Sequence, residues 1–302
     1  MPVKIAVVGL GHMGMLHLKK ALAIESVRVV ALIEKNREKL CHLREKFQID
    51  CYENYVEIDK KIDGAIIATP ATTHYEIAKF FLENGVHLFV EKPLAITYKE
   101  AEDLCNLAES KSVQLQVGFL ERYNPALRQA IRMLEDPRYL EMRRMSPYTG
   151  RSLDVNVIMD LMVHDLDLLS SIKKEKVTFV SGKGVKFLSD TVDEAVAILG
   201  FEDDSVSVCT ASRISIDKER SLKLVDKEKV IKVDFLNMTL TVASRNGCGL
   251  SLHCYEFEKK DLISEELEDF ISSIEEGKEP IVKGRDTLNS IFLAEKITNS
   301  LC

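Results

Sequence analysis

The glycine run near the amino terminus constrains the fold more than any other feature of this sequence. Residues 9–14 read Gly-Leu-Gly-His-Met-Gly, directly after the apolar segment Val3–Val8. Between a strand and a helix, the pattern G-x-G-x-x-G is typical of a dinucleotide-binding fold. Its glycines permit a tight turn, close approach of a pyrophosphate and close helix–strand packing, and the helix start adds N–H groups that face phosphate. A cofactor site is therefore expected at Gly9, Gly11, His12, Met13 and Gly14.

The first 120 residues alternate apolar strand-like runs with helical segments. The predicted strands are Val3–Val8, Arg28–Ile33, Gly64–Ala68, Val86–Val90 and Val113–Val117. The predicted helices are Met15–Ala23, Arg37–Phe47, Tyr75–Glu83 and Lys99–Ser110. Because the strands are continuous apolar runs, we expect a parallel sheet with helices on both faces. Residues 1–120 are thus predicted to form a Rossmann domain.

After Gly118 the rhythm changes to short strands separated by turn residues. Strand-like segments follow one another from Tyr139–Met145 to Leu250–Phe257, interrupted by a long predicted helix over Val155–Ile172. Strands in series with hairpin-like spacing indicate an antiparallel sheet. The predicted fold class is therefore α/β, with an N-terminal Rossmann domain and a C-terminal α/β domain that contains an open, mostly antiparallel sheet.

Glu34 bears on the choice of cofactor. It lies twenty residues after Gly14, at the end of the second predicted strand. A carboxylate at this place accepts hydrogen bonds from the adenosine ribose and repels a 2′-phosphate, so NAD is expected ahead of NADP. Lys35 and Arg37 keep NADP open, because either cation could meet a 2′-phosphate if Glu34 turned away.

Composition excludes several classes of protein. The chain is 46% hydrophobic and 29% charged, and no apolar run is long enough for a membrane helix, so a globular protein without a membrane partner is expected. The net charge of −7, with no basic cluster, argues against nucleic acid and leaves a small anionic ligand open. The seven cysteines form no Cys-x-x-Cys pair, and the first residues lack the zones of a signal peptide. Reduced thiols in the cytoplasm are therefore expected.

Three metal-ligating residue types cluster near the end of the chain. Cys248, His253 and Cys254 are close in sequence. However, His253 and Cys254 are adjacent in a predicted strand, so their side chains point to opposite faces. We therefore expect no metal.

Further motifs follow the glycine loop in a fixed order. They are Ala68-Thr69-Pro70 with His74, Glu91-Lys92-Pro93, Gly118-Phe119 with Arg122-Tyr123-Asn124-Pro125, and Asp160-Leu161-Met162-Val163-His164-Asp165. This series resembles the glucose–fructose oxidoreductase / inositol dehydrogenase / rhizopine-catabolism family of oxidoreductases. Within that family, residues 145–160 are most similar to the subgroup of UDP-N-acetylglucosamine 3-dehydrogenases.

The resemblance implies roles for the motif residues. Lys92, Asp160 and His164 take the catalytic roles. Beyond the glycine loop, the expected cofactor site comprises Glu34, Lys35, Ala68, Thr69, Pro70, His74, Glu91 and Lys92. The resemblance also implies that residues 121–284 bind substrate and form the oligomer, and that a last helix in residues 285–302 packs back on the Rossmann domain.

The chemistry of the three proposed catalytic residues fits oxidation of a hydroxyl. His164 can take the hydroxyl proton at neutral pH, and Asp160, four residues before it, can hold the ring. Lys92 follows a strand end and can stabilise the developing alkoxide. The alternatives are an ordinary Asp–His pair on a helix surface and a solvated loop lysine.

Substrate contacts are expected from residues that precede and follow the second domain's first strand in sequence. The candidates are Glu121, Arg122, Tyr148 and Asn156. Asn156 is predicted to share a helix face with Asp160 and His164. Several cations flank that helix, either as surface charge or as contacts to a substrate phosphate, namely Arg143, Arg144 and Arg151.

These observations predict an NAD(P)-dependent dehydrogenase that oxidises a hydroxyl of a sugar, polyol or nucleotide sugar. The alternative is a non-catalytic NAD(P)-binding sensor or partner protein on the same fold. Reduction of a non-sugar carbonyl or a double bond is a third reading.

The second domain is also expected to form an oligomer. A sheet covered by helices on one face leaves its other face open, and neither side of the segment Ser205–Ser212 is strongly charged. Members of the resembled family commonly pair through this sheet, so a homodimer or homotetramer is expected.

Overall fold

The computed structural model describes residues 1–150 and 153–301, and the chain divides into two compact units. The first unit comprises Met1–Phe119 and Asp261–Leu288. The second comprises Leu120–Lys260 and the segment that begins at Asn289. The first boundary lies one residue earlier than expected, and the larger difference from the expected division is in the carboxy-terminal part of the chain.

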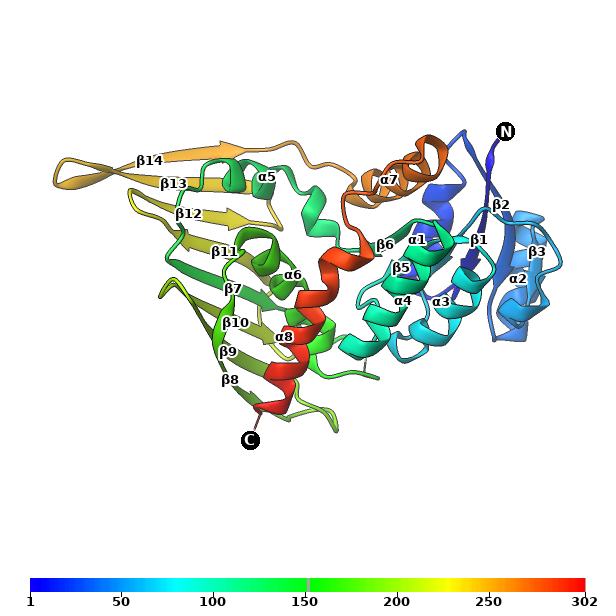
Figure 1. Ribbon diagram of the computed structural model, residues 1–302, viewed down its shortest axis with the longest axis horizontal. Coiled ribbons are helices and arrows are strands. Elements are labelled where there is room, and N and C mark those ends of the chain that lie inside the picture. The colour runs from blue at the N-terminus through cyan, green and yellow to red at the C-terminus, as the bar shows by residue number, and fades with distance from the viewer. Residues whose placement is uncertain (151–152, 302) are drawn as a thin grey trace. The chain divides into compact units, whose positions relative to one another are not determined.

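The first unit is built on a six-stranded sheet in the order β3-β2-β1-β4-β5-β6 (Figure 1). All neighbouring strands pair in parallel, which confirms the predicted Rossmann architecture. The strands are β1 (Val3–Val8), β2 (Val27–Ile33), β3 (Asp50–Tyr52), β4 (Gly64–Ile67), β5 (His87–Glu91) and β6 (Leu115–Gly118). Strand β3 was not among the predicted strands, because three residues with one buried side chain carry no periodic signal.

Two helices of the first unit show how the local sequence sets a helix start. Thr97 and Glu100 form a capping box at α4, and Asn36 accepts a hydrogen bond from the Lys39 amide at α2. The helices are α1 (His12–Ala21), α2 (Arg37–Phe47), α3 (His74–Glu83), α4 (Tyr98–Lys111) and α7 (Leu262–Glu276).

The carboxy-terminal helix that packs in the first unit is α7, whereas the last helix of the chain was expected to do so. Leu267, Phe270 and Ile271 of α7 are buried in the core with strand β1, and the Phe270 ring lies 6.0 Å from the Phe89 ring of β5. The expected domain boundary at residue 284 is therefore wrong, because Asp261–Leu288 belongs to the first unit. The apolar face of α7 covers part of the Rossmann sheet.

The second unit contains an eight-stranded sheet in the order β14-β13-β12-β11-β7-β10-β9-β8. Neighbouring strands are antiparallel except for β7 and β10, which run parallel, so the prediction of a mostly antiparallel sheet is confirmed. The strands are β7 (Tyr139–Met145), β8 (Val177–Val185), β9 (Glu194–Phe201), β10 (Val206–Ser212), β11 (Glu219–Val225), β12 (Lys229–Asp234), β13 (Thr239–Asn246) and β14 (Gly249–Glu256).

The helices of the second unit are α5 (Pro125–Arg132), α6 (Val163–Ile172) and α8 (Leu288–Asn299, assigned from Asn289). The predicted helix Val155–Ile172 is instead a π-helical turn, Ile158–Met162, that continues into α6. The last helix, expected on the Rossmann domain, packs within its own unit. A Cβ placed on Gly182 of β8 would lie 3.1 Å from Ile297 of α8, and Asn289 donates to Ser170 of α6 at 2.9 Å.

One face of this sheet carries the helices and the other is open (Figure 1). In β10 the buried side chains are Ser207, Cys209 and Ala211, whereas Val206 and Val208 are half-buried on the open face. The strand register joins eight residues into a continuous row across the open face, here termed the apolar row: Phe179, Gly200, Val206, Tyr139, Val225, Val230, Ala243 and Leu252.

Within residues 1–150 and 153–301, no helix combines the length and the apolar character needed to cross a membrane.

Candidate active site

The glycine loop has the geometry that a dinucleotide requires. Gly9 has φ +83°, and a Cβ on it would lie 2.8 Å from the Ala68 carbonyl oxygen. A Cβ on Gly14 would lie 1.8 Å from the Gly9 carbonyl oxygen, so only glycine lets α1 approach β1 this closely. A Cβ on Gly11 would meet nothing within 4 Å. The three positions thus provide the turn, the close packing and the open approach that a pyrophosphate needs.

Glu34 follows β2 beside this loop and is held in one position. Its carboxylate accepts hydrogen bonds from the amides of Leu10 at 3.3 Å and Asn36 at 3.2 Å, and Lys39 Nζ lies 3.1 Å away. Burial alone would raise the pKa of Glu34, but Lys39 and these amides outweigh it and hold the pKa below its ordinary value. The ionised carboxylate can accept hydrogen bonds from the hydroxyl groups of a ribose.

The cations near Glu34 differ in their availability. Arg37, weighed above as a 2′-phosphate partner, forms an ion pair of 2.7 Å with Glu53. Lys35 is exposed. Lys39, which the sequence analysis did not select, is the cation that contacts the Glu34 carboxylate.

The segment after β4 carries Ala68, Thr69 and Pro70 beside the glycine loop. His74, expected to contact the cofactor, is 1% exposed. Its Nδ1 lies 2.8 Å from the Pro93 carbonyl oxygen and its Nε2 lies 2.9 Å from the Thr69 carbonyl oxygen. Both ring nitrogens are therefore occupied, and His74 joins two loops at the carboxyl edge of the sheet.

Glu91 ends strand β5 at the same edge, and Lys92 directly follows it. Glu91 Oε1 lies 2.6 Å from Nε2 of His17, a fully buried residue of α1. Burial would raise the pKa of Glu91, but the hydrogen bond with His17 and the charge of Lys92 keep the pKa below its ordinary value. The Glu91 side chain is thus anchored inside the unit, while Lys92 is half-buried.

Asp160 and His164 lie in the second unit, where the π-helical turn passes into α6. Both side chains are half-buried, in a segment whose other residues are largely buried. Such π turns are frequent at functional sites. Asn156, expected on the same face, instead caps this segment. Its Oδ1 accepts from the amides of Ile158 and Met159 at 3.1 and 3.0 Å.

The other predicted substrate residues have different surroundings. Glu121 is 6% exposed and lies 3.5 Å from Arg144. Arg122 binds the buried Asp167 through two hydrogen bonds of 2.7 and 3.0 Å. Both therefore belong to ion pairs within the second unit. Tyr148 is 43% exposed.

Two of the cations that flank the π-helical turn already form ion pairs with carboxylates of the second unit. Arg144 is 2% exposed and donates to Asp165 at 3.0 and 2.9 Å. Arg143 pairs with Glu219 on the open face of the sheet at 3.0 Å. Arg151 lies outside the described residues.

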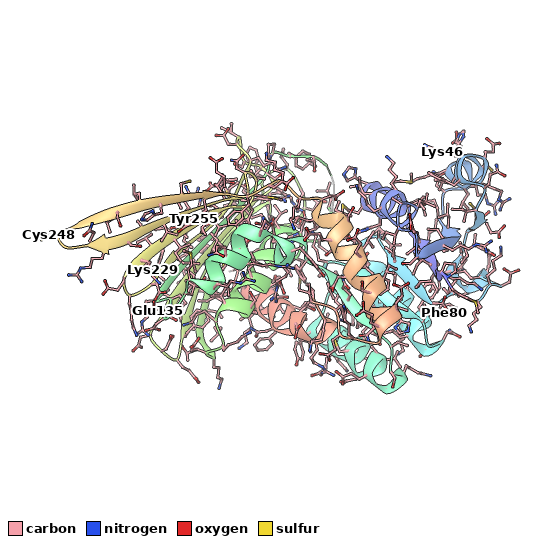
Figure 2. The ribbon with its side chains drawn as sticks, turned by 90° about the horizontal axis from the view of Figure 1, so that it is seen from above. Lys46, Phe80, Glu135, Lys229, Cys248 and Tyr255 are labelled. Atoms are coloured by element: carbon pink, nitrogen blue, oxygen red, sulfur yellow. The ribbon has the colours of Figure 1, made fainter. Side chains whose placement is uncertain are left out.

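The suspected metal ligands are not brought together. Figure 2 shows Cys248 at the tip of the β13–β14 hairpin, while His253 and Cys254 lie in β14. In the part of the chain that the structure describes, no three His, Cys, Asp or Glu side chains form a metal-binding group.

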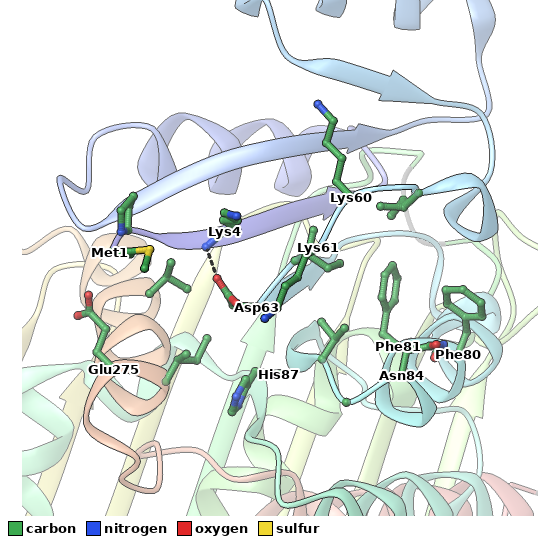
Figure 3. Close-up of a pocket in the computed structure, with 17 residues that line it drawn as sticks. Met1, Lys4, Lys60, Lys61, Asp63, Phe80, Phe81, Asn84, His87 and Glu275 are labelled. Atoms are coloured by element: carbon green, nitrogen blue, oxygen red, sulfur yellow. Dashed lines mark hydrogen bonds between the residues drawn. The ribbon is translucent and has the colours of Figure 1, made fainter.

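A cavity of about 890 Å³ lies at the amino ends of β1, β4 and β5 (Figure 3). Its lining includes Lys4, Asp63, Phe81 and His87. The glycine loop, Ala68 and Lys92 lie at the opposite, carboxyl ends of these strands, where open parallel sheets bind their ligands. This cavity is therefore separate from the cofactor site.

A parallel sheet with this glycine loop and an anchored carboxylate after β2 defines the class of Rossmann dinucleotide-binding proteins. Comparison with known families gives the assignment within that class. Residues 3–119 match the Gfo/Idh/MocA oxidoreductase family with an NAD-binding Rossmann fold, and residues 132–230 match the Gfo/Idh/MocA C-terminal domain. The chain belongs to the Gfo/Idh/MocA family, which confirms the resemblance of the motifs.

Individual relatives agree with this assignment. The chain is 31% identical over 277 residues to UDP-N-acetylglucosamine 3-dehydrogenase of Acidithiobacillus ferrooxidans, covering 89% of this chain and 87% of the relative. A solved structure of that organism's enzyme GnnA aligns with a TM-score of 0.91 at 29% identity, covering 100% of this chain and 98% of the other. Bacillus subtilis scyllo-inositol 2-dehydrogenase (NAD(+)) is 27% identical over 327 residues, covering 99% and 94% of the two chains.

Family membership settles the reaction class. The chain is an NAD(P)-dependent dehydrogenase that acts on CH–OH groups, and the open approach above Gly11 together with the ionised Glu34 fits the cofactor.

Proposed function

We propose that the protein oxidises a ring hydroxyl of a nucleotide sugar, with the 3-hydroxyl of UDP-N-acetylglucosamine as the leading candidate. The observation that carries the proposal is the 31% identity to a dehydrogenase of that name over 277 residues, in a chain that contains Lys92, Asp160 and His164. Inositol dehydrogenases are more distant by identity, so a free polyol is the second candidate.

Each proposed catalytic residue has one task. His164 accepts the proton of the substrate hydroxyl as the C–H bond breaks and the carbonyl forms. Asp160 orients the imidazole and stabilises its charged form. Lys92 donates a hydrogen bond to the reacting oxygen. When NAD is bound, its nicotinamide would supply the hydride acceptor for the two electrons removed from the carbon.

NAD is proposed as the working cofactor in preference to NADP. The Glu34 carboxylate is ionised and fixed by two amides and Lys39, so a 2′-phosphate would meet a negative charge. The remaining contacts proposed for the cofactor come from His12, Met13, Lys35, Ala68, Thr69, Pro70, Glu91 and Lys92. The occupied ring nitrogens of His74 support a role in holding these loops.

A reducing compartment, such as the cytoplasm, fits the thiols. Cys105 and Cys209 are buried, and burial raises the pKa of each thiol to about 12. Such thiols react slowly, so they need no disulfide for protection.

The open face of the sheet supports a homo-oligomer. The apolar row crosses all eight strands, and its two end residues, Phe179 and Leu252, are 55% and 70% exposed. A continuous apolar row of this kind is suited to pack against its own copy about a two-fold axis. We propose a dimer, or a tetramer built from dimers, and light scattering at micromolar concentration tests it. A mass near the 34.1 kDa of one chain would contradict this proposal.

The activity itself is tested with a panel of substrates. UDP-N-acetylglucosamine, free N-acetylglucosamine and inositols are each supplied with NAD, and the absorbance of reduced nicotinamide is followed. The nucleotide sugar should give the highest kcat/KM, and His164→Ala should lower turnover by about 10²–10⁴-fold with unchanged NAD affinity. Equal turnover by wild type and variant would remove His164 from the mechanism, whereas no turnover of any substrate in the panel would favour the non-catalytic sensor.

A further inference from the structure

Arg220 occupies an unusual place on the helix-covered face of the second sheet. It lies in β11 directly opposite Arg144 of β7 in the strand register. Arg144 faces α6, since it donates to Asp165 of that helix, so Arg220 lies on the same face. The Arg144 side chain is 2% exposed, whereas the Arg220 side chain is 40% exposed. The helix layer therefore leaves Arg220 accessible.

The guanidinium of Arg220 has few partners in residues 1–150 and 153–301. Its one described ion-pair contact joins Nη1 to Glu121 Oε1 at 3.7 Å, beyond the usual length of a hydrogen bond. The same oxygen lies 3.5 Å from Arg144 Nη1. A guanidinium offers five N–H donors, so Arg220 has unused donors at a place that solvent reaches.

The two arginines of this cluster repel each other and share one carboxylate. Partial burial and the neighbouring charge of Arg144 lower the pKa of Arg220, which records the cost of holding two cations together. Glu121 is shared between both arginines. Burial raises the pKa of Asp165, the other partner of Arg144, in opposition to the Arg144 charge. An anion in front of Arg220 would supply acceptors for the guanidinium donors that Glu121, at 3.7 Å, does not bind.

Position connects this cluster with the proposed chemistry. Asp165, which Arg144 holds, directly follows His164, the proposed proton acceptor. The flanking cations considered from the sequence are less suitable, because Arg144 is buried and Arg143 lies on the open face. We propose that Arg220 binds a phosphate of the substrate and thereby selects a nucleotide sugar over an uncharged sugar or polyol. This inference rests on the proposed function, and it names the residue that would recognise the charged part of the substrate.

The planar fork of arginine suits a phosphate, which it can bind through two parallel hydrogen bonds. Arg220→Gln removes the charge with little change in size, and Arg220→Lys keeps the charge but loses the fork. Arg138→Gln is the matched control, because the Arg138 side chain is 49% exposed and has comparably weak ion pairs of 3.6 and 3.5 Å.

The experiment is calorimetric titration of UDP, UDP-N-acetylglucosamine and N-acetylglucosamine into the full chain saturated with NAD, which keeps the probes out of the cofactor site. Arg220→Gln should weaken UDP and UDP-N-acetylglucosamine about ten- to hundredfold, Arg220→Lys should weaken them less, and Arg138→Gln should change them less than about twofold. Added salt should weaken wild-type binding more than that of Arg220→Gln.

Two results would overturn the inference: no measurable UDP binding by the wild type, or equal UDP affinity of the wild type and Arg220→Gln. Thermal unfolding of each variant identifies a folding defect, and retained affinity of Arg220→Gln for NAD confirms an intact first unit. If UDP binding depends on Arg220 but no sugar is oxidised, the proposed function fails and this inference stands. If wild type and Arg220→Gln oxidise UDP-N-acetylglucosamine with the same kcat/KM, the inference fails and the dehydrogenase stands.

Discussion

Substitution of Gly11 by alanine separates cofactor binding from folding. Gly11 precedes α1 with φ −63°, an ordinary value for any residue, and an added Cβ meets nothing within 4 Å. The folded chain should therefore tolerate Gly11→Ala. The free energy of unfolding should rise by about 0.4–1 kcal/mol, because alanine lowers the conformational entropy of the unfolded chain. The new methyl group would, however, occupy the space through which a pyrophosphate approaches the backbone.

The expected loss of affinity follows from the amide–phosphate contacts. A hydrogen bond to a charged group contributes about 1.5–3 kcal/mol, so losing one should weaken NAD about ten- to hundredfold. NAD affinity is measured by calorimetric titration, and stability by thermal unfolding of the same samples.

Two further glycines provide the controls. In Gly14→Ala the new Cβ would lie 1.8 Å from the Gly9 carbonyl oxygen, so this variant should lose both stability and NAD binding. In Gly249→Ala the nearest atom is 3.9 Å away, and both properties should persist. If Gly11→Ala binds NAD as tightly as the wild type, the assigned role of the glycine loop is refuted.

Three other substitutions test separate parts of the account. Glu34→Ser should weaken NAD and strengthen NADP by about tenfold each in calorimetric titrations, because Lys39 at 3.1 Å is then released toward a 2′-phosphate; unchanged preference would contradict the role of Glu34. Burial and the charge of Glu91 raise the pKa of Glu266 well above its ordinary 4.5, so wild-type stability falls as pH rises above about 4.5 toward the folded-state pKa. The gain in Tm of Glu266→Gln over wild type should therefore grow as pH rises, and a pH-independent difference would refute it. Val206→Glu, in the middle of the apolar row, should give monomers in light scattering that still bind NAD; an intact oligomer would exclude this face.

Local patterns sufficed for most of the architecture. The apolar runs and the glycine loop predicted five of the six parallel strands, and the motif order predicted the family. These features are visible in sequence because each depends on a short segment: a glycine that must admit a phosphate, or a run of buried side chains.

Features that depend on distant segments were not predictable. His17 has no neighbour in sequence that marks it as the partner of Glu91. The position of Arg220 beside Arg144 follows only from the register of β11 and β7. The expected helix face of Asn156, Asp160 and His164 assumed 3.6 residues per turn, which the π-helical turn Ile158–Met162 does not keep.

The same limit explains the misplaced helices. The amphipathic patterns of α7 and α8 indicated that each buries one face, but not which sheet it covers. The ring contact of Phe270 with Phe89, and the position of Ile297 beside Gly182 with no room for a further side chain, decide that question.

The most direct test of the central claim follows the hydrogen atom that leaves the substrate. UDP-N-acetylglucosamine carrying deuterium at C3 is incubated with the protein and NAD, and the reduced cofactor is analysed by mass spectrometry. We expect the deuterium to be transferred to the nicotinamide ring, and His164→Ala to slow this transfer by about 10²–10⁴-fold. Reduced cofactor without deuterium, or no reduced cofactor at all, would contradict oxidation at this carbon.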